Sequence, residues 1–392
     1  MGDDRKWEVT YFKVETTTGD GKTDSLYANG RMQVPVIVTI KAIEKGTTKR
    51  CWLQPDELSE IALIDYDDSP NKLSDGWSYT DSQSNGSVFA TAMNVAINAN
   101  ALARQVSDST ATARDAAVWT EDLMNQDTDS LVITSNAAVP AGEVAARSDN
   151  DPQSKKFWVL TTRIESKRIG ARIKQPDDKT VTTHSKFDSR ATLKGIEPIV
   201  YTTDNVTIVR KDTADGSYRF DWQSAGDGNW YTSQKHWDQD NYFVSSTIHE
   251  FIKADIYGFD TTGYASGHPG DSRLKNCYAY CAPDDKNLKL SFIWEFGPEA
   301  TKAAGLYKEG TIVDWLTPCG RKAYAYPDIK VNQKSNALCL TRLAIDCPDT
   351  IWGAKWSSGN CGFTIYDVYG NAGKFSASYS DDHNLLTISN AN

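Results

Sequence analysis

Residues 26–43 carry the pattern that most constrains the fold of this chain. Strand-forming residues alternate along this run, so that successive side chains fall on opposite faces of an extended backbone. Pro35 has no N–H group for a sheet ladder, so we expect it at the start of the strand or at a sheet edge. The pattern predicts a β-strand with one well-buried face, formed by Val34, Val36, Val38, Ile40 and Ala42.

The dipeptide Asn29-Gly30 precedes this strand. Asn and Gly tolerate the positive φ angles that a type I′ turn needs at both of its central positions. The sequence therefore predicts a β-hairpin that joins the segment before Asn29 to the strand at residues 34–43.

Most of the chain repeats this kind of signal. Short runs of strand formers are separated by Gly, Pro and Asp, which is typical of antiparallel β-sandwiches. The clearest meander is near the C-terminus, at residues 363–369, 374–379 and 385–388. The fold class predicted is mainly β, with antiparallel β-sandwich domains. The other expected strands are residues 7–14, 61–66, 77–79, 157–164, 169–173, 180–183, 191–193, 199–203 and 206–211.

A long insertion interrupts this series at about residues 86–154. Residues 87–105 are rich in Ala and place Phe89, Met93, Ile97 and Leu102 at helical spacing. Residues 107–152 are polar and show no period. We expect a long polar, partly helical insertion, which is unusual in a compact domain unless it serves a function.

A change in composition near residue 214 predicts two domains. Residues 1–214 form an N-terminal β-sandwich region, as one sandwich or two small ones, and residues 215–392 form a separate aromatic- and Cys-rich β domain. Of the 7 cysteines, all but Cys51 lie in this second part. Reduced, buried thiols are the first expectation, with disulfides and a metal site as alternatives. Cys277 and Cys281 lack a second matching pair, so we predict neither a metal nor a cofactor.

The overall charge argues against nucleic acid as a partner. The net charge is −10 and the sequence pI is about 5.1, whereas nucleic-acid binding draws its affinity from Lys and Arg. No run approaches the roughly 18 apolar residues of a membrane helix, so membrane insertion is not evident. The N-terminus opens with polar residues and has no classical signal peptide. We therefore expect a soluble protein that is cytoplasmic when made and released by lysis or by a specialised system.

Two segments begin like known functional motifs, but neither motif is complete. The segment before Lys22-Thr23 resembles a phosphate-binding loop, but Thr16 stands where its first glycine is needed. His249-Glu250 begins like a zinc-protease helix, but Lys253 replaces the second His.

The strongest catalytic candidate is Glu295, because desolvation inside the apolar run 292–296 would raise its pKa as a glycosidase acid requires. The alternative is that Glu295 points outward from a half-buried strand. Whether the chain is an enzyme stays open, with a non-enzyme favoured. The carboxylates available as its partner are Asp238, Asp240, Glu250 and Asp255.

Aromatic side chains are concentrated in two segments of the second domain. Residues 226–242 and 352–356 combine Trp and Tyr with Gly, Asp and Asn, which is typical of binding loops on a β scaffold. Packing in the core is the competing interpretation, because Trp is large and often half buried. The residues predicted to bind a ligand are Trp230, Tyr231, Trp237, Trp352 and Trp356.

Together these features favour a non-enzymatic recognition protein of a toxin-like or lectin-like kind. Its expected partner is a cell-surface glycan or protein, and homo-oligomer formation stays open. Three alternatives also remain: a structural or self-assembling β protein, a glycan-active hydrolase and a pore-forming toxin.

Overall fold

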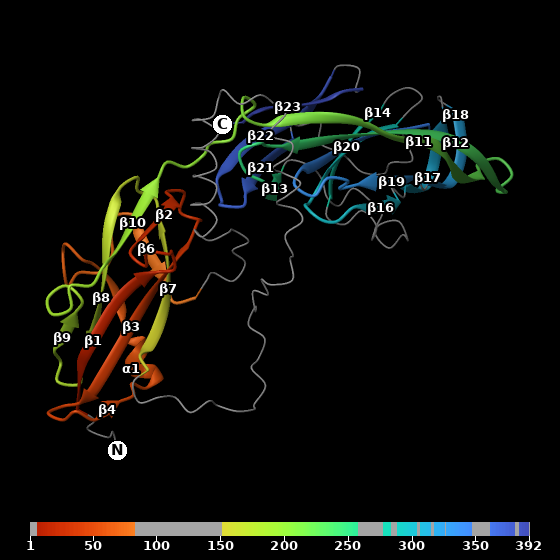
Figure 1. Ribbon diagram of the computed structural model, residues 1–392. Coiled ribbons are helices and arrows are strands. Elements are labelled where there is room, and N and C mark those ends of the chain that lie inside the picture. Colours follow the sequence, from red (N-terminus) through yellow and green to blue (C-terminus); the bar gives the residue numbers. More distant parts are fainter. Residues whose placement is uncertain are drawn as a thin grey trace, which may run out of the picture. The chain divides into compact units, whose positions relative to one another are not determined.

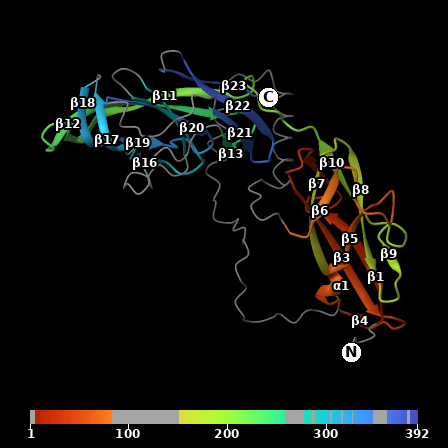
Figure 2. The ribbon, with the colours of Figure 1, turned by 180° about the vertical axis from the view of Figure 1, so that it is seen from behind.

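The computed structural model describes residues 6–82, 151–257, 277–283, 288–303, 306–314, 317–325, 327–346, 361–380 and 384–391. Strands dominate these residues, and α1 (Pro55–Ser59) is the single helix among them. The chain is therefore mainly β, which confirms the fold class predicted from the sequence. It divides into two compact units, unit 1 (Met1–Glu197) and unit 2 (Pro198–Asn392), shown in Figures 1 and 2.

Unit 1 contains two five-stranded sheets. One has the order β1-β3-β7-β6 with β4 paired to β3, and the other has the order β2-β10-β8-β5 with β9 paired to β8. Strand pairs are antiparallel except β2 with β10, which is parallel. The strands are β1 Trp7–Thr16, β2 Thr23–Tyr27, β3 Val34–Glu44, β4 Arg50–Cys51, β5 Ala62–Asp65, β6 Trp77–Thr80, β7 Gln153–Thr161, β8 Ser166–Lys174, β9 Thr180–Thr182 and β10 Ala191–Ile196.

The structure confirms the buried face that the sequence predicts for β3. All of its members are fully inaccessible, namely Val34, Val36, Val38, Ile40 and Ala42. Pro35 is the second residue of the strand, and the pairing of β3 with β1 extends only as far as Val36. The missing N–H of Pro35 is therefore tolerated, because Pro35 lies just beyond the end of that ladder.

The hairpin predicted at Asn29-Gly30 was wrong, because β2 pairs with β10 while β3 pairs with β1 and β7. The Oδ1 atom of Asn29 accepts the N–H groups of Arg31 (2.9 Å) and Met32 (3.0 Å), and Gly30 has a φ of 68°. The N–H of Gly30 donates to the carbonyl of Thr161 (3.0 Å) at the end of β7. This side-chain-closed turn uses the residues of a hairpin but carries the chain from one sheet to the other.

The predicted insertion at residues 86–154, with its helix near residues 87–105, lies almost wholly outside the described residues. The chain is described up to residue 82 and again from residue 151, and β7 begins at Gln153.

Unit 2 is built on a seven-stranded sheet with the order β14-β15-β20-β12-β11-β18-β17. A four-stranded sheet, β13-β21-β22-β23, and a two-stranded sheet, β16-β19, accompany it. The strands are β11 Thr207–Ser224, β12 Trp230–Ser245, β13 Phe251–Tyr257, β14 Cys277–Pro283, β15 Leu288–Trp294, β16 Ala300–Ala303, β17 Leu306–Asp314, β18 Thr317–Ala325, β19 Asp328–Val331, β20 Leu338–Ile345, β21 Cys361–Asp367, β22 Ala372–Tyr379 and β23 Leu386–Asn390.

The large sheet of unit 2 buries both of its faces. On one face, Phe243 of β12 and Phe292 of β15 join a core that includes Ile329 of β19. On the other face, Val244 and Leu340 join a core that includes residues of β13, β21, β22 and β23. Because successive residues of a strand point to opposite sides, the neighbours Phe243 and Val244 serve the two different cores.

The C-terminal meander predicted from the sequence is confirmed as β21-β22-β23, paired in antiparallel order. Its first turn closes around the fully buried carboxylate of Asp367. This group accepts hydrogen bonds from the hydroxyl of Tyr201 (2.8 Å), from the N–H groups of Tyr369 (2.8 Å) and Asn371 (2.9 Å), and from the Asn371 side chain (3.0 Å).

The division between the units falls between Glu197 and Pro198, whereas the sequence places a boundary at residue 214. Residue 214 lies inside β11, which pairs with β12 on both sides of that position through a register shift between Asp212 and Ala214. Thr213 is the extra residue at this shift, so the position marks an irregularity within a long strand and not a domain boundary.

Asp367→Ala is expected to destabilise unit 2 by about 3 kcal/mol or more, because it leaves several buried donors without an acceptor. Asp367→Asn keeps one acceptor oxygen and should cost clearly less. Urea denaturation of the two variants measures the difference, and equal losses would contradict this role of the carboxylate.

Asp24 provides a pH-dependent test of unit 1. Its Oδ2 atom is buried and has no hydrogen-bond partner, and burial raises the pKa of the carboxyl group to about 6. The unfolded group titrates near pH 4, so between about pH 4 and 6 the folded state holds the extra proton and stability falls as pH rises. Asp24→Asn should therefore be more stable than wild type at pH 8, and the gap should vanish by about pH 4.

Asp20→Asn is the matched control for this series. Hydrogen bonds from Thr23 and Lys22 hold the pKa of the Asp20 carboxyl group well below its usual range. Its contribution is thus present at neutral pH and lost only as pH falls below about 4. Asp20→Asn should lower stability at pH 7, the opposite sign to Asp24→Asn. Urea melts from pH 3 to 8 that gave both variants the same sign would refute the assignment.

Candidate binding surface

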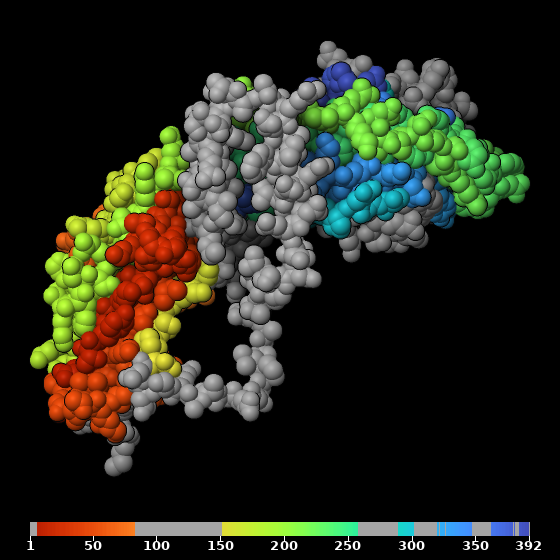
Figure 3. All heavy atoms as spheres, viewed as in Figure 1, coloured from red at the N-terminus to blue at the C-terminus, as the bar shows by residue number. Residues whose placement is uncertain are grey.

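The longest strand pair in unit 2 ends in a protruding tip (Figures 1 and 3). β11 and β12 stay paired from Thr207 opposite Ser245 to Gln223 opposite Trp230. Near the tip, β18 adds a third strand, pairing with β11 from Phe220 onward. β17 pairs with the other side of β18, so the last residues of the hairpin are held in a four-stranded platform.

The turn at the tip is held by hydrogen bonds of its own backbone and side chains. Ser224 donates its N–H to the carbonyl of Asn229 (2.9 Å), and its carbonyl accepts the N–H of Gly228 (3.2 Å). The Gln223 side chain donates to the carbonyl of Gly228 (2.9 Å), and Asp227 accepts the N–H of Asn229 (3.0 Å). Gly228 has a φ of 74°, a left-handed conformation that Gly adopts without strain.

One aromatic pair lies on the face of the tip that continues the core. Trp222 and Tyr231 are directly opposite each other in the ladder, and their rings stack at 5.0 Å between centroids with an interplanar angle of 24°. The Tyr231 hydroxyl donates to Asp227 (2.5 Å), and this bond lowers the pKa of the Asp227 carboxyl group to about 2. Tyr231 is 43% exposed, so an ordered ring edge faces solvent.

A second aromatic pair lies on the opposite face. Trp230 is 50% exposed, and its ring lies 5.6 Å from that of Tyr324 on β18. Asp221 lies opposite both Thr232 and Tyr324, and it accepts hydrogen bonds from Thr232 (2.6 Å) and Arg219 (2.8 Å). Aromatic rings thus stand beside a carboxylate, a hydroxyl and a guanidinium group. We call Trp222, Trp230, Tyr231, Tyr324, Asp221 and Thr232 the aromatic tip.

The structure separates the residues that the sequence grouped as ligand-binding. Trp230 and Tyr231 are exposed at the tip, whereas Trp237 is 8% exposed and packs in the core of unit 2. Trp352 and Trp356 lie outside the described residues. Two further members, Trp222 and Tyr324, were missed by sequence reasoning. The alternation in residues 322–325 indicates a strand, but only the pairing of β18 with β11 shows that it reaches the tip.

Glu295 is exposed and follows Trp294, the last residue of β15. The strand registers place Asp240 of β12 opposite Arg342 of β20, which in turn lies opposite Ser291 of β15. Ser291 is four residues before Glu295, and β15 is two strands away from β12. With about 3.3 Å per residue and about 4.8 Å between strands, the Cα atoms of Glu295 and Asp240 are about 16 Å apart. Asp240 is also 1% exposed and is bound by Arg210 and Arg342, so it does not offer Glu295 the accessible partner carboxylate that a glycosidase needs.

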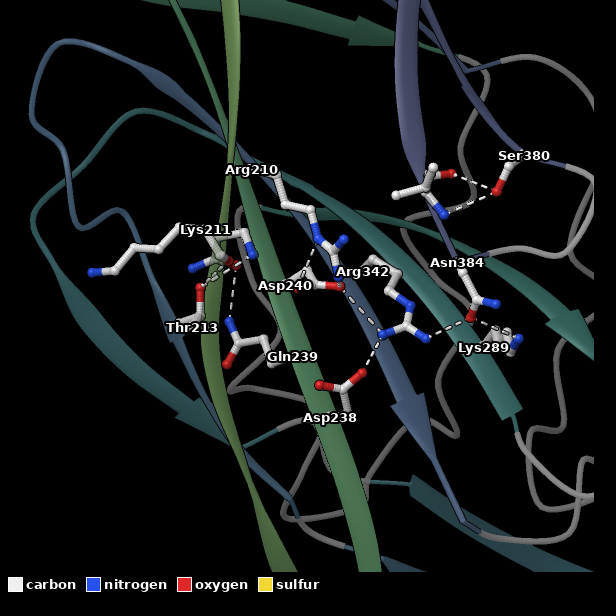
Figure 4. A network of polar contacts seen from close by, with 12 residues as sticks. Arg210, Lys211, Thr213, Asp238, Gln239, Asp240, Lys289, Arg342, Ser380 and Asn384 are labelled. Carbon is white, nitrogen blue, oxygen red and sulfur yellow. Dashed lines mark hydrogen bonds and ion pairs between the residues drawn. The ribbon is translucent and has the colours of Figure 1, made fainter.

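Asp238 and Asp240 belong to a network of charges on one face of the large sheet (Figure 4). The Arg342 guanidinium donates to both carboxylates and to the Asn384 side chain (2.9 Å). Arg210 makes two further bonds to Asp240, at 3.1 and 3.0 Å. Asp240 is 1% exposed, so its charge is compensated inside the protein, and the network ties β11, β12 and β20 together.

No group of three or more His, Cys, Asp or Glu residues in the described part is arranged to hold a metal ion. Within the same residues, no helix has the length and apolar character needed to cross a membrane. Cys51 and Cys339 are buried, and burial raises the pKa of the Cys339 thiol to about 11. That thiol is protonated at neutral pH, which makes it a poor nucleophile.

Comparisons of the chain with protein-family models, curated proteins and solved structures found no match. The geometry of the aromatic tip is therefore the basis for the function proposed below.

The variants Trp230→Ala and Trp237→Ala should show which of these two side chains lies on the surface and which lies in the core. Trp237 is buried, so its truncation should cost about 3–5 kcal/mol of unfolding free energy through lost burial and a cavity. Trp230 is half exposed, and its truncation should cost less than about 1 kcal/mol. Urea melts measure both costs. Iodide should quench part of the tryptophan fluorescence of the wild type. This quenchable part should be lost in Trp230→Ala and kept in Trp237→Phe. The reverse pattern would place Trp230 in the core.

Proposed function

We propose that this chain is a non-enzymatic recognition protein of a lectin-like kind, which binds a cell-surface glycan through its aromatic tip. The single observation that carries the proposal is the half-exposed Trp230, fixed beside Tyr324 and next to the hydrogen-bonded carboxylate of Asp221.

The chemistry of a sugar ring matches this arrangement. One face of a pyranose presents C–H groups, which pack against the electron-rich face of an aromatic ring. The hydroxyl groups at its edge need hydrogen-bond partners, and Asp221, Thr232 and Arg219 offer acceptors and donors on the same face of the hairpin as Trp230. A ring on Trp230 would thus find both kinds of contact without rearrangement of the backbone.

The rigidity of the tip supports the same proposal. The stacking of Tyr231 on Trp222 and its bond to Asp227 restrict this side chain before any ligand arrives. Aromatic side chains with few rotatable bonds lose little conformational entropy on binding. Ordered, exposed aromatic side chains are thus suited to contacts with a partner.

A glycan array probed with the labelled full-length protein tests the proposal. We expect binding to a limited set of glycans, and Trp230→Ala should weaken it by about tenfold or more, as expected for a central aromatic contact. Val209→Ala is the matched control, because Val209 is a 46% exposed apolar residue on the same hairpin near its other end. This control should bind like wild type.

Two results would overturn the proposal. One is an array without signal while the protein still binds intact cells, which would indicate a protein partner. The other is glycan binding that Trp230→Ala leaves unchanged. Turnover of the bound glycans would favour the hydrolase, and leakage from glycan-free vesicles would favour the pore-former.

A further inference from the structure

Unit 1 contains a groove of about 720 Å³ that the proposed function does not use. β1 forms one wall, and the segment at residues 187–192 forms the opposite one. Residues 20–23 close one end. This volume lies within the range of about 300–1,000 Å³ that is typical of ligand sites.

The β1 wall is the outer edge of a sheet. β1 is the end strand of its sheet and pairs with β3 alone among the described strands. On the open side, the N–H of Val14 donates to the Ser189 hydroxyl (3.0 Å), and the N–H of Thr16 donates to the carbonyl of Gly21 (3.1 Å). Residues two apart in a strand present their backbone groups to the same edge. The backbone N–H and C=O groups of Phe12 therefore point toward the groove, as those of Val14 do.

The floor of the groove is apolar. Phe12 and Val14 are 1% and 2% exposed and belong to the core of unit 1. Phe187 reaches them from the opposite wall, with its ring packed edge-on against Phe12 at 6.2 Å. Phe187 is half-buried, so an apolar side chain that entered the groove would rest on its ring, which Phe12 holds in place.

The rim carries equal numbers of positive and negative side chains. Lys13 pairs with Glu15 (2.5 Å) on the β1 wall, and Arg190 pairs with Asp188 (2.7 Å) on the opposite wall. Each wall thus presents one charge of each sign, two residues apart in the sequence. The remaining lining charges are those of Asp20 and Lys22.

The turn at the end of the groove is closed to phosphate. The Asp20 carboxylate accepts the N–H groups of Lys22 (2.9 Å) and Thr23 (3.0 Å), together with the hydroxyl groups of Thr18 (2.8 Å) and Thr23. These are the donors that would cradle a phosphate, and the chain's own carboxylate occupies them. The resemblance of this segment to a phosphate-binding loop therefore does not extend to its chemistry.

We propose that this groove binds an extended peptide segment of a partner protein, which adds as a strand along the outer edge of β1. The peptide backbone would bond to Phe12 and replace Ser189 at the N–H of Val14, and an apolar side chain would rest on Phe187. Acidic and basic side chains of the peptide meet the alternating charges of the two walls. The groove follows β1 from Tyr11 to Glu15, and at about 3.3 Å per residue this length accommodates about five peptide residues.

A random heptapeptide phage library, panned against the full-length protein, tests this proposal. The enriched sequences should combine an apolar residue with one acidic and one basic residue in a fixed order. Fluorescein-labelled synthetic copies should bind in solution, as measured by anisotropy. In hydrogen exchange, the bound peptide should protect the backbone amide of Phe12.

The double variant Lys13→Glu/Glu15→Lys provides the decisive comparison. It keeps the ion pair on the β1 wall but exchanges the positions of the two charges, and both side chains are partly exposed, so the fold should persist. Peptides selected on wild type should lose at least about tenfold in affinity, because like charges then face each other. Panning on the variant should enrich the opposite charge order. Lack of enrichment, or equal binding to both proteins, would overturn the proposal.

Glycan binding by the aromatic tip, measured on the same double variant, should stay at the wild-type level. The groove and the tip thus have separate readouts, and either can fail without the other.

Discussion

Unit 2 depends on the register between β12 and β20, which buried polar side chains fix on both faces of the sheet. On one face, Arg342 binds Asp238 and Asp240. On the other face, Thr341 donates to Asn241 (2.6 Å) and accepts the indole N–H of Trp294 (2.8 Å). A slip by one residue would move each of these groups to the opposite face, where its partners are absent. Buried polar groups without partners are costly, so one register is strongly preferred.

The aromatic tip follows from this register. β12 is held by β20 from Trp237 to Val244, and β11 follows β12 through the whole hairpin. Beyond Trp237, the hairpin continues past the end of β20, and its further strand pairing comes from β18 near the turn. The buried part of the hairpin sets the direction of the exposed part, and the β11–β18 pairing places Tyr324 beside Trp230. Rings from distant parts of the chain thus meet on a platform that the core keeps in place.

Local patterns predicted some strands of this chain, because period-two alternation reports directly on a buried face. Other predictions were wrong: most of the expected loop at residues 226–242 belongs to β12, and no strand forms at residues 199–203. Val34 and its alternate neighbours in β3, and the meander β21-β22-β23, are examples. Pairing was harder to predict, since Asn29-Gly30 fits a hairpin turn and a side-chain-closed turn between sheets equally well. Burial of single aromatics was also undetermined. Trp230 and Trp237 lie in one aromatic segment, yet only the contacts of β12 with β20 place Trp237 in the core.

Fluorine NMR of the full-length protein labelled with 5-fluorotryptophan tests the central claim most directly. The signals of Trp230 and Trp237 are assigned from the variants Trp230→Phe and Trp237→Phe, and the protein is titrated with the glycan that the array ranks highest. The account predicts that the Trp230 signal moves with saturation while the Trp237 signal stays fixed, because only the former lies at the exposed tip. Saturable binding that shifts other tryptophan signals and leaves that of Trp230 unchanged would contradict it.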